Sequence, residues 1–295
     1  MTDMNDYIVR GMTMDGFVKV VAIRSTNMVA EAARIHNTTA NATAAFGRCL
    51  TAASMMGNMQ KVENGSMTMQ VRGGGPIGGI TVVSDAVGNV RGYVLEPHLP
   101  LIEKYPGKLD IGATVGTDGT MTIIRDLQMK EPYVGSIQLV TGEIGDDVTA
   151  YFVQSEQTPT ACALGVLVDR DSSVKVAGGY LIQLLPGAPD EVIDVLEAGI
   201  QKAGAVTKML EKGLTPEEIL TEVCGDLGVL FFDNEPVSYK CYCSRERVEA
   251  ALISLGRKEL EEIAAEGKSF PVECQFCDTI YEFTPADIEE MLKNI

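Results

Sequence analysis

The 295-residue sequence contains no tryptophan and only two histidines, His36 and His98. It is also poor in cations, because 24 lysines and arginines stand against 41 aspartates and glutamates, and the formal net charge is −17. Phosphate binding draws its affinity from clustered lysine and arginine, so this charge argues against a nucleic acid as partner. An anionic membrane surface is disfavoured for the same reason.

Long apolar runs and targeting segments are lacking as well. The sequence has no window of 18 uncharged apolar residues, which excludes a transmembrane helix. Its first residues, MTDMNDYIVRG, have neither the basic nor the apolar region of a secretion signal. We therefore expect a cytoplasmic protein in a reducing compartment, where clustered cysteines more often serve metal binding or redox chemistry than structural disulfides.

Familiar catalytic motifs are absent: there is no G-x-S-x-G and no H-E-x-x-H. The stretch RGGGPIGG has the G-x-G-x-x-G spacing at Gly73, Gly75 and Gly78, but the strand-like ITVVSD follows it. A dinucleotide site must open a helix at this point, so we predict a tight loop between strands. His36 and His98 lie far from the cysteine pairs, and we expect surface or hydrogen-bonded roles for them. The sequence does not predict an enzyme.

Short β-rich runs separated by glycine, aspartate or asparagine turns fill the first 180 residues. One alanine- and methionine-rich stretch, 41–59, has the spacing of a helix. Strands and helices do not alternate regularly, so the pattern predicts an α+β fold with a mixed sheet rather than a doubly wound one. Residues 1–180 are therefore expected to form an N-terminal α+β core domain.

A helical connector is predicted over 181–235. Apolar residues recur every three or four positions from Val192 to Leu210, and Gly213 can end that helix. Thr215 then starts a capping box, and a second helix should run to about Leu227. These apolar stripes either form ordinary helix cores that stay packed or are held in place by the C-terminal domain, whose unfolding would uncover them.

Two close pairs of cysteines, C-x-C and C-x-x-C, dominate the region 236–295. The pairs are Cys241 with Cys243 and Cys274 with Cys277. Four thiolates make a complete tetrahedral set for structural zinc, and a domain of about sixty residues needs such support because its apolar core is small. An iron–sulfur cluster is the main alternative. The isolated Cys49, Cys162 and Cys224 are expected to be small core residues.

The zinc interpretation has a redox consequence. Four thiolates around Zn²⁺ leave a net charge of −2, and Lys240, Arg245 and Arg247 beside the first pair either favour thiolate or are plain surface charges. Zinc binding contributes on the order of ten kcal/mol to the folding of a small domain. Oxidation of the ligands should therefore unfold the domain.

Along its whole length the sequence resembles a known family, the redox-regulated chaperones of the bacterial 33-kDa heat-shock protein family. The resemblance rests on GNVRGYV from Gly88, YFVQSEQTPTA from Tyr151, GGYLIQLLPGA from Gly178, and the order and spacing of the cysteines. No ligand position departs from the family pattern.

The resemblance implies an ATP-independent holdase that acts under oxidative stress. Cys241, Cys243, Cys274 and Cys277 would bind zinc in the reduced, inactive form, and oxidation would pair Cys241 with Cys243 and Cys274 with Cys277. Zinc would leave, the switch domain (236–295) and connector would lose order, and the exposed apolar surface would capture unfolding client proteins. Family members are cytoplasmic and can form homodimers.

Two rival functions follow from the residues alone. A zinc ribbon that binds nucleic acid is disfavoured by the charge and by the lack of a basic, aromatic patch. A dithiol–disulfide oxidoreductase would normally place its C-x-x-C at the start of a helix after a strand, whereas the surroundings here predict a hairpin.

Overall fold

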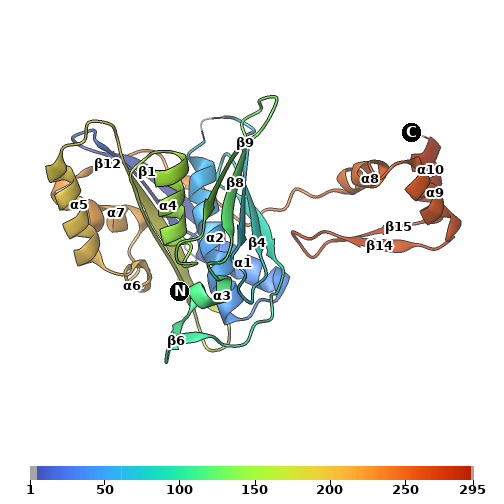
Figure 1. The fold of residues 1–295 in the computed structure, drawn as a ribbon, viewed down its shortest axis with the longest axis horizontal. Helices are drawn as coiled ribbons and strands as arrows, with labels where there is room; N and C mark the ends of the chain where they lie inside the picture. The colour runs from blue at the N-terminus through green and yellow to red at the C-terminus, as the bar shows by residue number, and fades with distance from the viewer. Residues whose placement is uncertain (1–4, 61, 294–295) are drawn as a thin grey trace. The chain divides into compact units, whose positions relative to one another are not determined.

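The computed structural model describes residues 5–60 and 62–293, which form two compact units, 1–240 and 241–295. Their secondary structure confirms the α+β fold class (Figure 1). Residues 181–235, predicted as a connector, lie within the first unit. The three-part division into 1–180, 181–235 and 236–295 stays a prediction. No helix in the described ranges is long and apolar enough to cross a membrane.

The first unit contains two large antiparallel sheets. One has the strand order β5 (Val90–Val94), β4 (Ile80–Asp85), β3 (Ser66–Arg72), β8 (Thr120–Asp126) and β9 (Tyr133–Gln138). The other has the order β10 (Thr160–Val168), β11 (Val174–Leu184), β2 (Val18–Arg24), β1 (Tyr7–Thr13) and β12 (Val229–Phe231), and β13 (Glu235–Pro236) also pairs with β1. A small hairpin joins β6 (Glu103–Tyr105) and β7 (Lys108–Leu109). The sequence predicts a mixed sheet, with both parallel and antiparallel strands. Among the described residues the strands of both large sheets pair antiparallel, and the one parallel pairing is an isolated bridge between Val90 and Tyr239.

Helix α2 (Ala40–Asn58) forms the centre of this unit. Almost all of its side chains are buried, since it contacts strands of both large sheets. A helix that is apolar or small on every side, as this one is, belongs in a core. The other helices on this side are α1 (Thr26–His36), α3 (Ile111–Val115) and α4 (Gly145–Ser155).

The opposite face of the six-stranded sheet is covered by the predicted connector (Figure 1). The expected first helix is broken in two, because Gly204 adopts a φ of +71°, and α5 (Asp190–Ala203) is followed by α6 (Val206–Glu211). Helix α7 (Pro216–Cys224) has the predicted capping box at Thr215, and the 3-10 turn Gly225–Leu227 completes it. Gly213 ends α6 with a φ of +83°, as predicted.

The second unit is small. It comprises α8 (Arg245–Ile253), α9 (Arg257–Ala265), the hairpin β14 (Phe270–Glu273) and β15 (Ile280–Phe283), and α10 (Pro285–Lys293). In the described residues its core has few buried apolar side chains: Leu252, Leu260, Phe283, Ile288 and Met291. The core of this unit is thus as limited as the sequence predicts.

Candidate metal centre

The two cysteine pairs lie on different local structures of the second unit. Cys241 and Cys243 lie in the extended segment before α8. The next residue, Ser244, caps this helix, because its Oγ accepts a hydrogen bond from Arg247 N. Cys274 and Cys277 lie in the turn of the β14–β15 hairpin, which is closed by the bond from Cys277 N to Cys274 O (3.2 Å). The hairpin predicted around Cys274 and Cys277 is therefore present.

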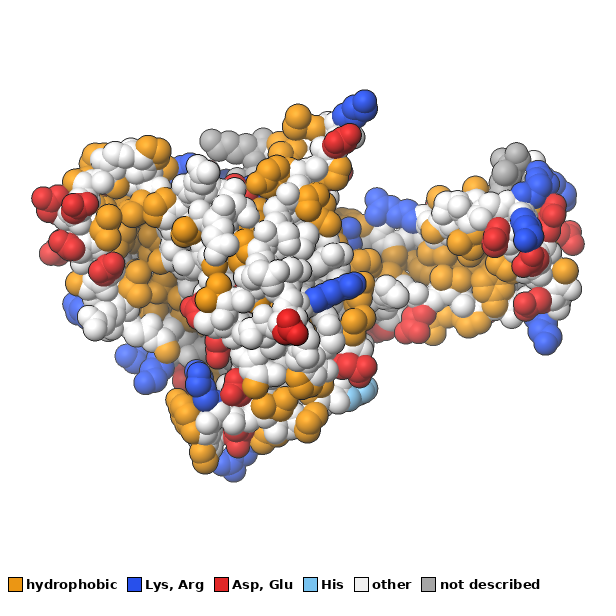
Figure 2. Space-filling model, in the orientation of Figure 1, with side chains coloured by type: hydrophobic (Ala, Val, Ile, Leu, Met, Phe, Trp, Pro, Cys, Tyr) orange, Lys and Arg blue, Asp and Glu red, His pale blue; other side chains and the backbone are white. Residues whose placement is uncertain are grey.

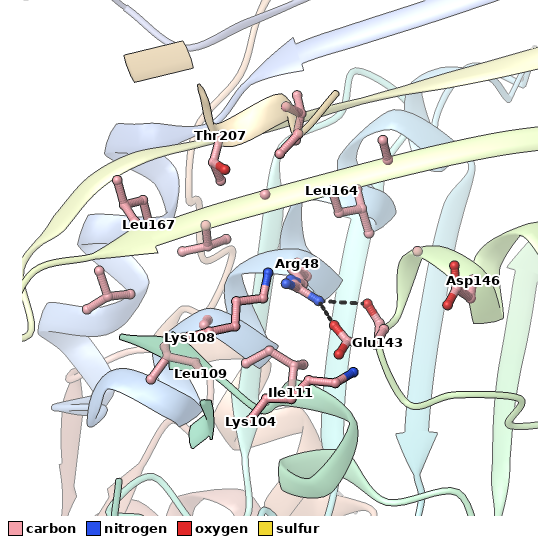
Figure 3. A pocket seen from close by; sticks show the side chains of 18 of the residues that line it. Arg48, Lys104, Lys108, Leu109, Ile111, Glu143, Asp146, Leu164, Leu167 and Thr207 are labelled. Carbon is pink, nitrogen blue, oxygen red and sulfur yellow. Dashed lines mark hydrogen bonds and ion pairs between the residues drawn. The ribbon is translucent and has the colours of Figure 1, made fainter. Parts of the chain in front are cut away.

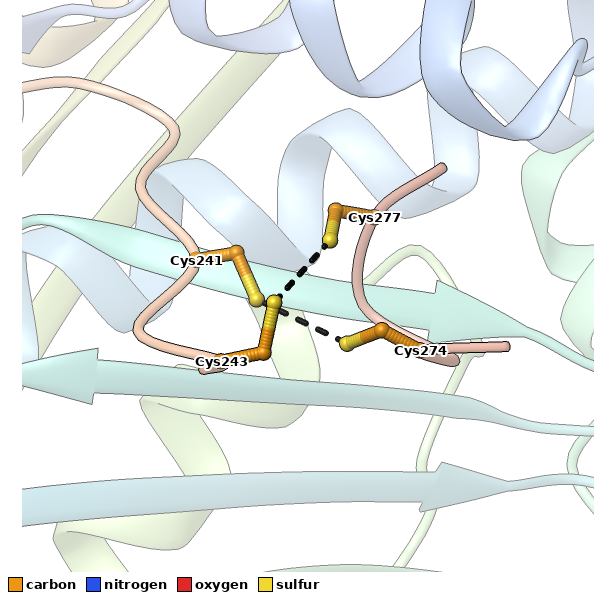
Figure 4. A group of neighbouring side chains, drawn as sticks. All are labelled: Cys241, Cys243, Cys274 and Cys277. Atoms are coloured by element: carbon orange, nitrogen blue, oxygen red, sulfur yellow. Dashed lines mark hydrogen bonds between the residues drawn. The ribbon is translucent and has the colours of Figure 1, made fainter. Parts of the chain in front are cut away.

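The fold brings all four sulfur atoms together (Figure 4). Cys241 Sγ lies 3.7 Å from Cys274 Sγ, and Cys243 Sγ lies 3.5 Å from Cys277 Sγ. All four sulfurs lie within 4.8 Å of one another. A tetrahedral site with Zn–S bonds of about 2.3 Å has sulfur–sulfur edges of about 3.8 Å. The cluster can hold a metal ion, and its donor set and dimensions fit zinc.

Burial and hydrogen bonds to sulfur shift the pKa of three of the clustered thiols. Burial and hydrogen bonds with the neighbouring thiols raise the pKa of Cys241, although the backbone N–H of Cys243 opposes this. Burial also raises the pKa of Cys274 against an opposing bond from the backbone of Phe276. At Cys243, burial is outweighed by hydrogen bonds from Tyr281 and the other thiols, and the pKa falls to about 7.

Tyr281 is a site residue that the sequence reasoning did not single out. Its Oη donates to Cys243 Sγ at 3.1 Å, and this bond raises the pKa of Tyr281 to about 12. A second hydroxyl, Thr279 Oγ1, lies 3.3 Å from Cys277 Sγ. The sequence does contain a signal for both contacts, because Thr279 and Tyr281 follow Cys277 by two and four residues within the predicted hairpin.

The cations beside the first pair have other partners. Arg245 forms ion pairs with Glu249 and Asp287, and its guanidinium lies 4.5 Å from the centre of the Phe283 ring. Arg247 donates to the carbonyl oxygen of Tyr242 at 2.9 Å. These contacts favour a role in holding the second unit together rather than in activating thiolates.

The remaining candidates lie where the sequence predicts. Cys49 and Cys224 are fully buried and Cys162 is partly buried, and burial raises the pKa of each thiol. His36 is hydrogen-bonded to Tyr239, and His98 to Asn37.

The glycine-rich stretch connects β3 to β4 as a loop, so no helix begins there and the dinucleotide site stays excluded. Outside the cysteine cluster, the described residues hold no other group of three histidine, cysteine or acidic side chains close enough to ligate a metal.

Three comparisons agree on what this sequence and structure are similar to. The family model described as "Hsp33 protein" matches residues 6–284. A 33 kDa chaperonin of Bacillus cytotoxicus is 45% identical over 292 residues, covering 99% of this chain and 100% of that protein. A 33 kDa chaperonin of Agathobacter rectalis is 46% identical over 288 residues, covering 98% and 100%.

The structural comparison gives the same result. The crystal structure of the 33 kDa chaperonin (heat shock protein 33 homolog) of Thermotoga maritima matches with a TM-score of 0.90. The two chains are 33% identical, and the match covers 99% of each.

Proposed function

Because the chain belongs to the Hsp33 family of chaperones, we propose that it is an ATP-independent holdase switched on by oxidation of its four clustered cysteines. The observation that carries the proposal is the sulfur cluster, with edges close to those of a tetrahedral thiolate site. Cys241, Cys243, Cys274 and Cys277 would hold zinc in the resting protein. The proposed location is the cytoplasm.

When bound, zinc would supply on the order of ten kcal/mol of folding free energy to the second unit. The small core around Leu260 and Phe283 cannot replace that contribution. Loss of the thiolate ligands would therefore unfold residues 241–295.

The proposed oxidation forms one disulfide between Cys241 and Cys243 and another between Cys274 and Cys277. Each bond would remove two electrons from a pair of thiolates that hold zinc. One hydrogen peroxide would accept these electrons with two protons from solvent to give two waters, and the metal would leave as Zn²⁺. Since all four sulfurs lie within 4.8 Å of one another, the pairing is taken from the family resemblance rather than from the distances. Short intervening segments favour these pairs, and a bond across Tyr242 alone should be easily reduced again.

Clients would be unfolding proteins captured on apolar surface. Helices α6 and α7 pack against the six-stranded sheet and α5 packs against α7, which buries residues such as Leu196, Leu210 and Ile219. Figure 2 shows apolar side chains next to acidic ones in the region of α5 and α7, so part of this cluster already reaches the surface. Release of these helices would expose a patch suited to unfolded chains. The resting protein can also form a homodimer in this proposal.

One experiment tests the whole proposal. The zinc-loaded protein is treated with peroxide while zinc release, thiol content and suppression of client aggregation are followed together. We expect two disulfides per chain, release of one zinc and a rise in suppression on the same time course, all reversed by dithiothreitol. Equal suppression before and after oxidation would contradict the redox switch, and steady turnover in a disulfide-reduction assay would favour an enzyme instead. Binding of a nucleic acid that weakens with salt would revive the zinc-ribbon alternative.

A further inference from the structure

Strand β10 lies at the edge of the six-stranded sheet and borders a cavity of about 570 Å³. The cavity is lined by an unbroken run of β10, residues 162–168, and no strand of the described residues pairs with this edge. Its volume is within the range of ligand sites in proteins. An unpaired strand edge presents backbone donors and acceptors to any extended chain that fits beside it.

The outward-facing backbone groups can be identified from two glycines. A Cβ at Gly179 on β11 would meet the carbonyl oxygen of Ala163 at 2.6 Å, so Ala163 faces β11. A Cβ at Gly145 would meet Cys162 O at 3.3 Å and Leu164 N at 3.9 Å, so these groups face the other way. Backbone direction alternates along a strand.

The N–H and C=O groups of Leu164 and Val166 therefore point away from β11. No other described residue forms a hydrogen bond with them, and since Gly145 lies against Leu164 N, the groups open to an added strand are the C=O of Leu164 and the N–H and C=O of Val166.

The cavity opens around this edge on both faces of the sheet (Figure 3). On one side lie Arg48 of α2 and Ile111 of α3, and on the other lie Val206 and Thr207 at the start of α6. An added strand would thus direct its side chains alternately toward these two walls.

The two walls differ in charge. Arg48 forms an ion pair with Glu143 (2.6 Å), which neutralises both. The ammonium groups of Lys104 and Lys108, on the β6–β7 hairpin, form no hydrogen bond or ion pair with the described residues. Besides the Arg48–Glu143 pair, the other charged side chain lining the cavity is Asp146. The wall that contains Lys104 and Lys108, called the lysine wall, is therefore locally basic although the chain has a net charge of −17. The opposite wall, called the α6 wall, is formed by the uncharged Val206 and Thr207.

We propose that the β10 edge binds an extended peptide segment as an added strand, with acidic side chains toward the lysine wall and apolar side chains toward the α6 wall. Strand addition obtains affinity from main-chain hydrogen bonds and selectivity from alternate side chains. The inference rests on the proposed function, because such a segment would be part of an unfolding client. It adds a defined sequence preference to a binding activity otherwise based on apolar surface.

The test uses the full-length, zinc-loaded, reduced protein and a fluorescein-labelled decapeptide of five Glu-Val repeats. We expect saturable 1:1 binding in fluorescence anisotropy. A peptide of the same sequence with N-methyl groups on the amides of one edge keeps every side chain but cannot form the strand pairing, so it should bind at least about tenfold more weakly. Equal binding of the two peptides would overturn the proposal.

Charge reversal tests the acidic preference. The K104E/K108E variant should bind the Glu-Val peptide at least about fivefold more weakly and should gain affinity for a Lys-Val peptide. The matched control K130E/K212E changes the net charge equally at exposed positions outside the cavity, and its affinity should stay within about twofold of the wild type. Equal losses in both variants would show a general charge effect and overturn the assigned wall.

Aggregation assays on the oxidised protein keep this inference separate from the proposed function. If suppression of client aggregation persists while the peptide shows no strand-type binding, the edge site fails and the chaperone proposal stands. If the peptide binds but oxidation produces no suppression, the chaperone proposal fails and the edge site stands.

Discussion

The phenol oxygen of Tyr239 lies 3.0 Å from Nε2 of His36, although 203 positions separate the two residues in the chain. The same oxygen donates to Gly92 O at 2.8 Å and accepts from Gly92 N at 3.2 Å. Together with the bridge to Val90, these bonds fasten the end of the first unit to β5, two residues before Cys241.

Tyr239→Phe removes this oxygen and should destabilise the first unit by about 1–3 kcal/mol, because partly buried groups of Gly92 and His36 lose a partner. Denaturant unfolding gives the free energy, and the amide of Gly92 should exchange faster with deuterium. Tyr133→Phe is the control, since the hydroxyl of the exposed Tyr133 makes one long bond, of 3.4 Å to Ser155 O, with the described part of the chain. An unchanged exchange rate at the Gly92 amide would contradict the claim that Tyr239 holds the end of the first unit against β5.

Cys274→Ser should abolish tight zinc binding, because it removes one of four sulfur donors from the cluster. Zinc content after dialysis against a chelator measures the loss, and the second unit should lose its protected amides at the same time. Cys224→Ala is the control: this thiol is buried in the first unit and its removal should leave one zinc per chain. Retained stoichiometric zinc in Cys274→Ser would refute the ligand assignment.

Tyr281→Phe should weaken zinc binding by about tenfold while leaving the stoichiometry at one, because groups that hydrogen-bond to metal ligands orient them and tune their charge. Competition with a chromophoric chelator gives the affinity. Tyr133→Phe in the first unit again serves as control and should keep the wild-type affinity. The same affinity in both variants would show that the bond to Cys243 has no role in the site.

Local sequence signals predicted the features that depend on neighbouring residues. The capping box at Thr215 is formed by its two hydrogen bonds with Glu218. The clustering of the four cysteines could be predicted as well, since two short-spaced pairs have few alternatives in a reducing compartment.

Contacts between distant segments escaped the sequence reasoning. Nothing in the local pattern around Tyr239 points to His36 or Gly92, because the register that joins them is set by the packing of the whole first unit. The break at Gly204 was missed for a different reason: the apolar period continues across it, and only the backbone shows that α6 begins in a new direction.

Asp6→Asn should change how stability depends on pH. Burial raises the pKa of Asp6 to about 6, despite backbone hydrogen bonds that lower it, of which the one from Met28 N to Oδ2 is 2.6 Å long. The folded state therefore holds this proton more tightly than the unfolded state, and the contribution of Asp6 to stability falls as the pH rises from about 4 to 6. The difference of about two pKa units corresponds to at most about 3 kcal/mol.

The measurement is the difference in unfolding free energy between Asp6→Asn and the wild type at pH 4.5 and pH 7. The variant should gain about 1–3 kcal/mol relative to the wild type over this range, since its amide cannot ionise and can still accept the bond from Met28. Zinc binding also changes with pH, but it affects both proteins equally. Asp233→Asn, at an exposed carboxylate, should run parallel to the wild type, and a parallel Asp6→Asn curve would show that Asp6 does not titrate in this window.

Ile219→Ala tests whether the helices over the six-stranded sheet control client capture. Ile219 is fully buried between α7 and that sheet, so truncation should cost about 2–5 kcal/mol and loosen the helix without touching the cysteines. If release of these helices exposes the client surface, the reduced, zinc-loaded variant should suppress aggregation without oxidation. Glu222→Ala, an exposed change on the same helix, should stay inactive when reduced. A reduced Ile219→Ala protein that is destabilised, retains its zinc and still fails to suppress aggregation would place the client surface elsewhere in the first unit.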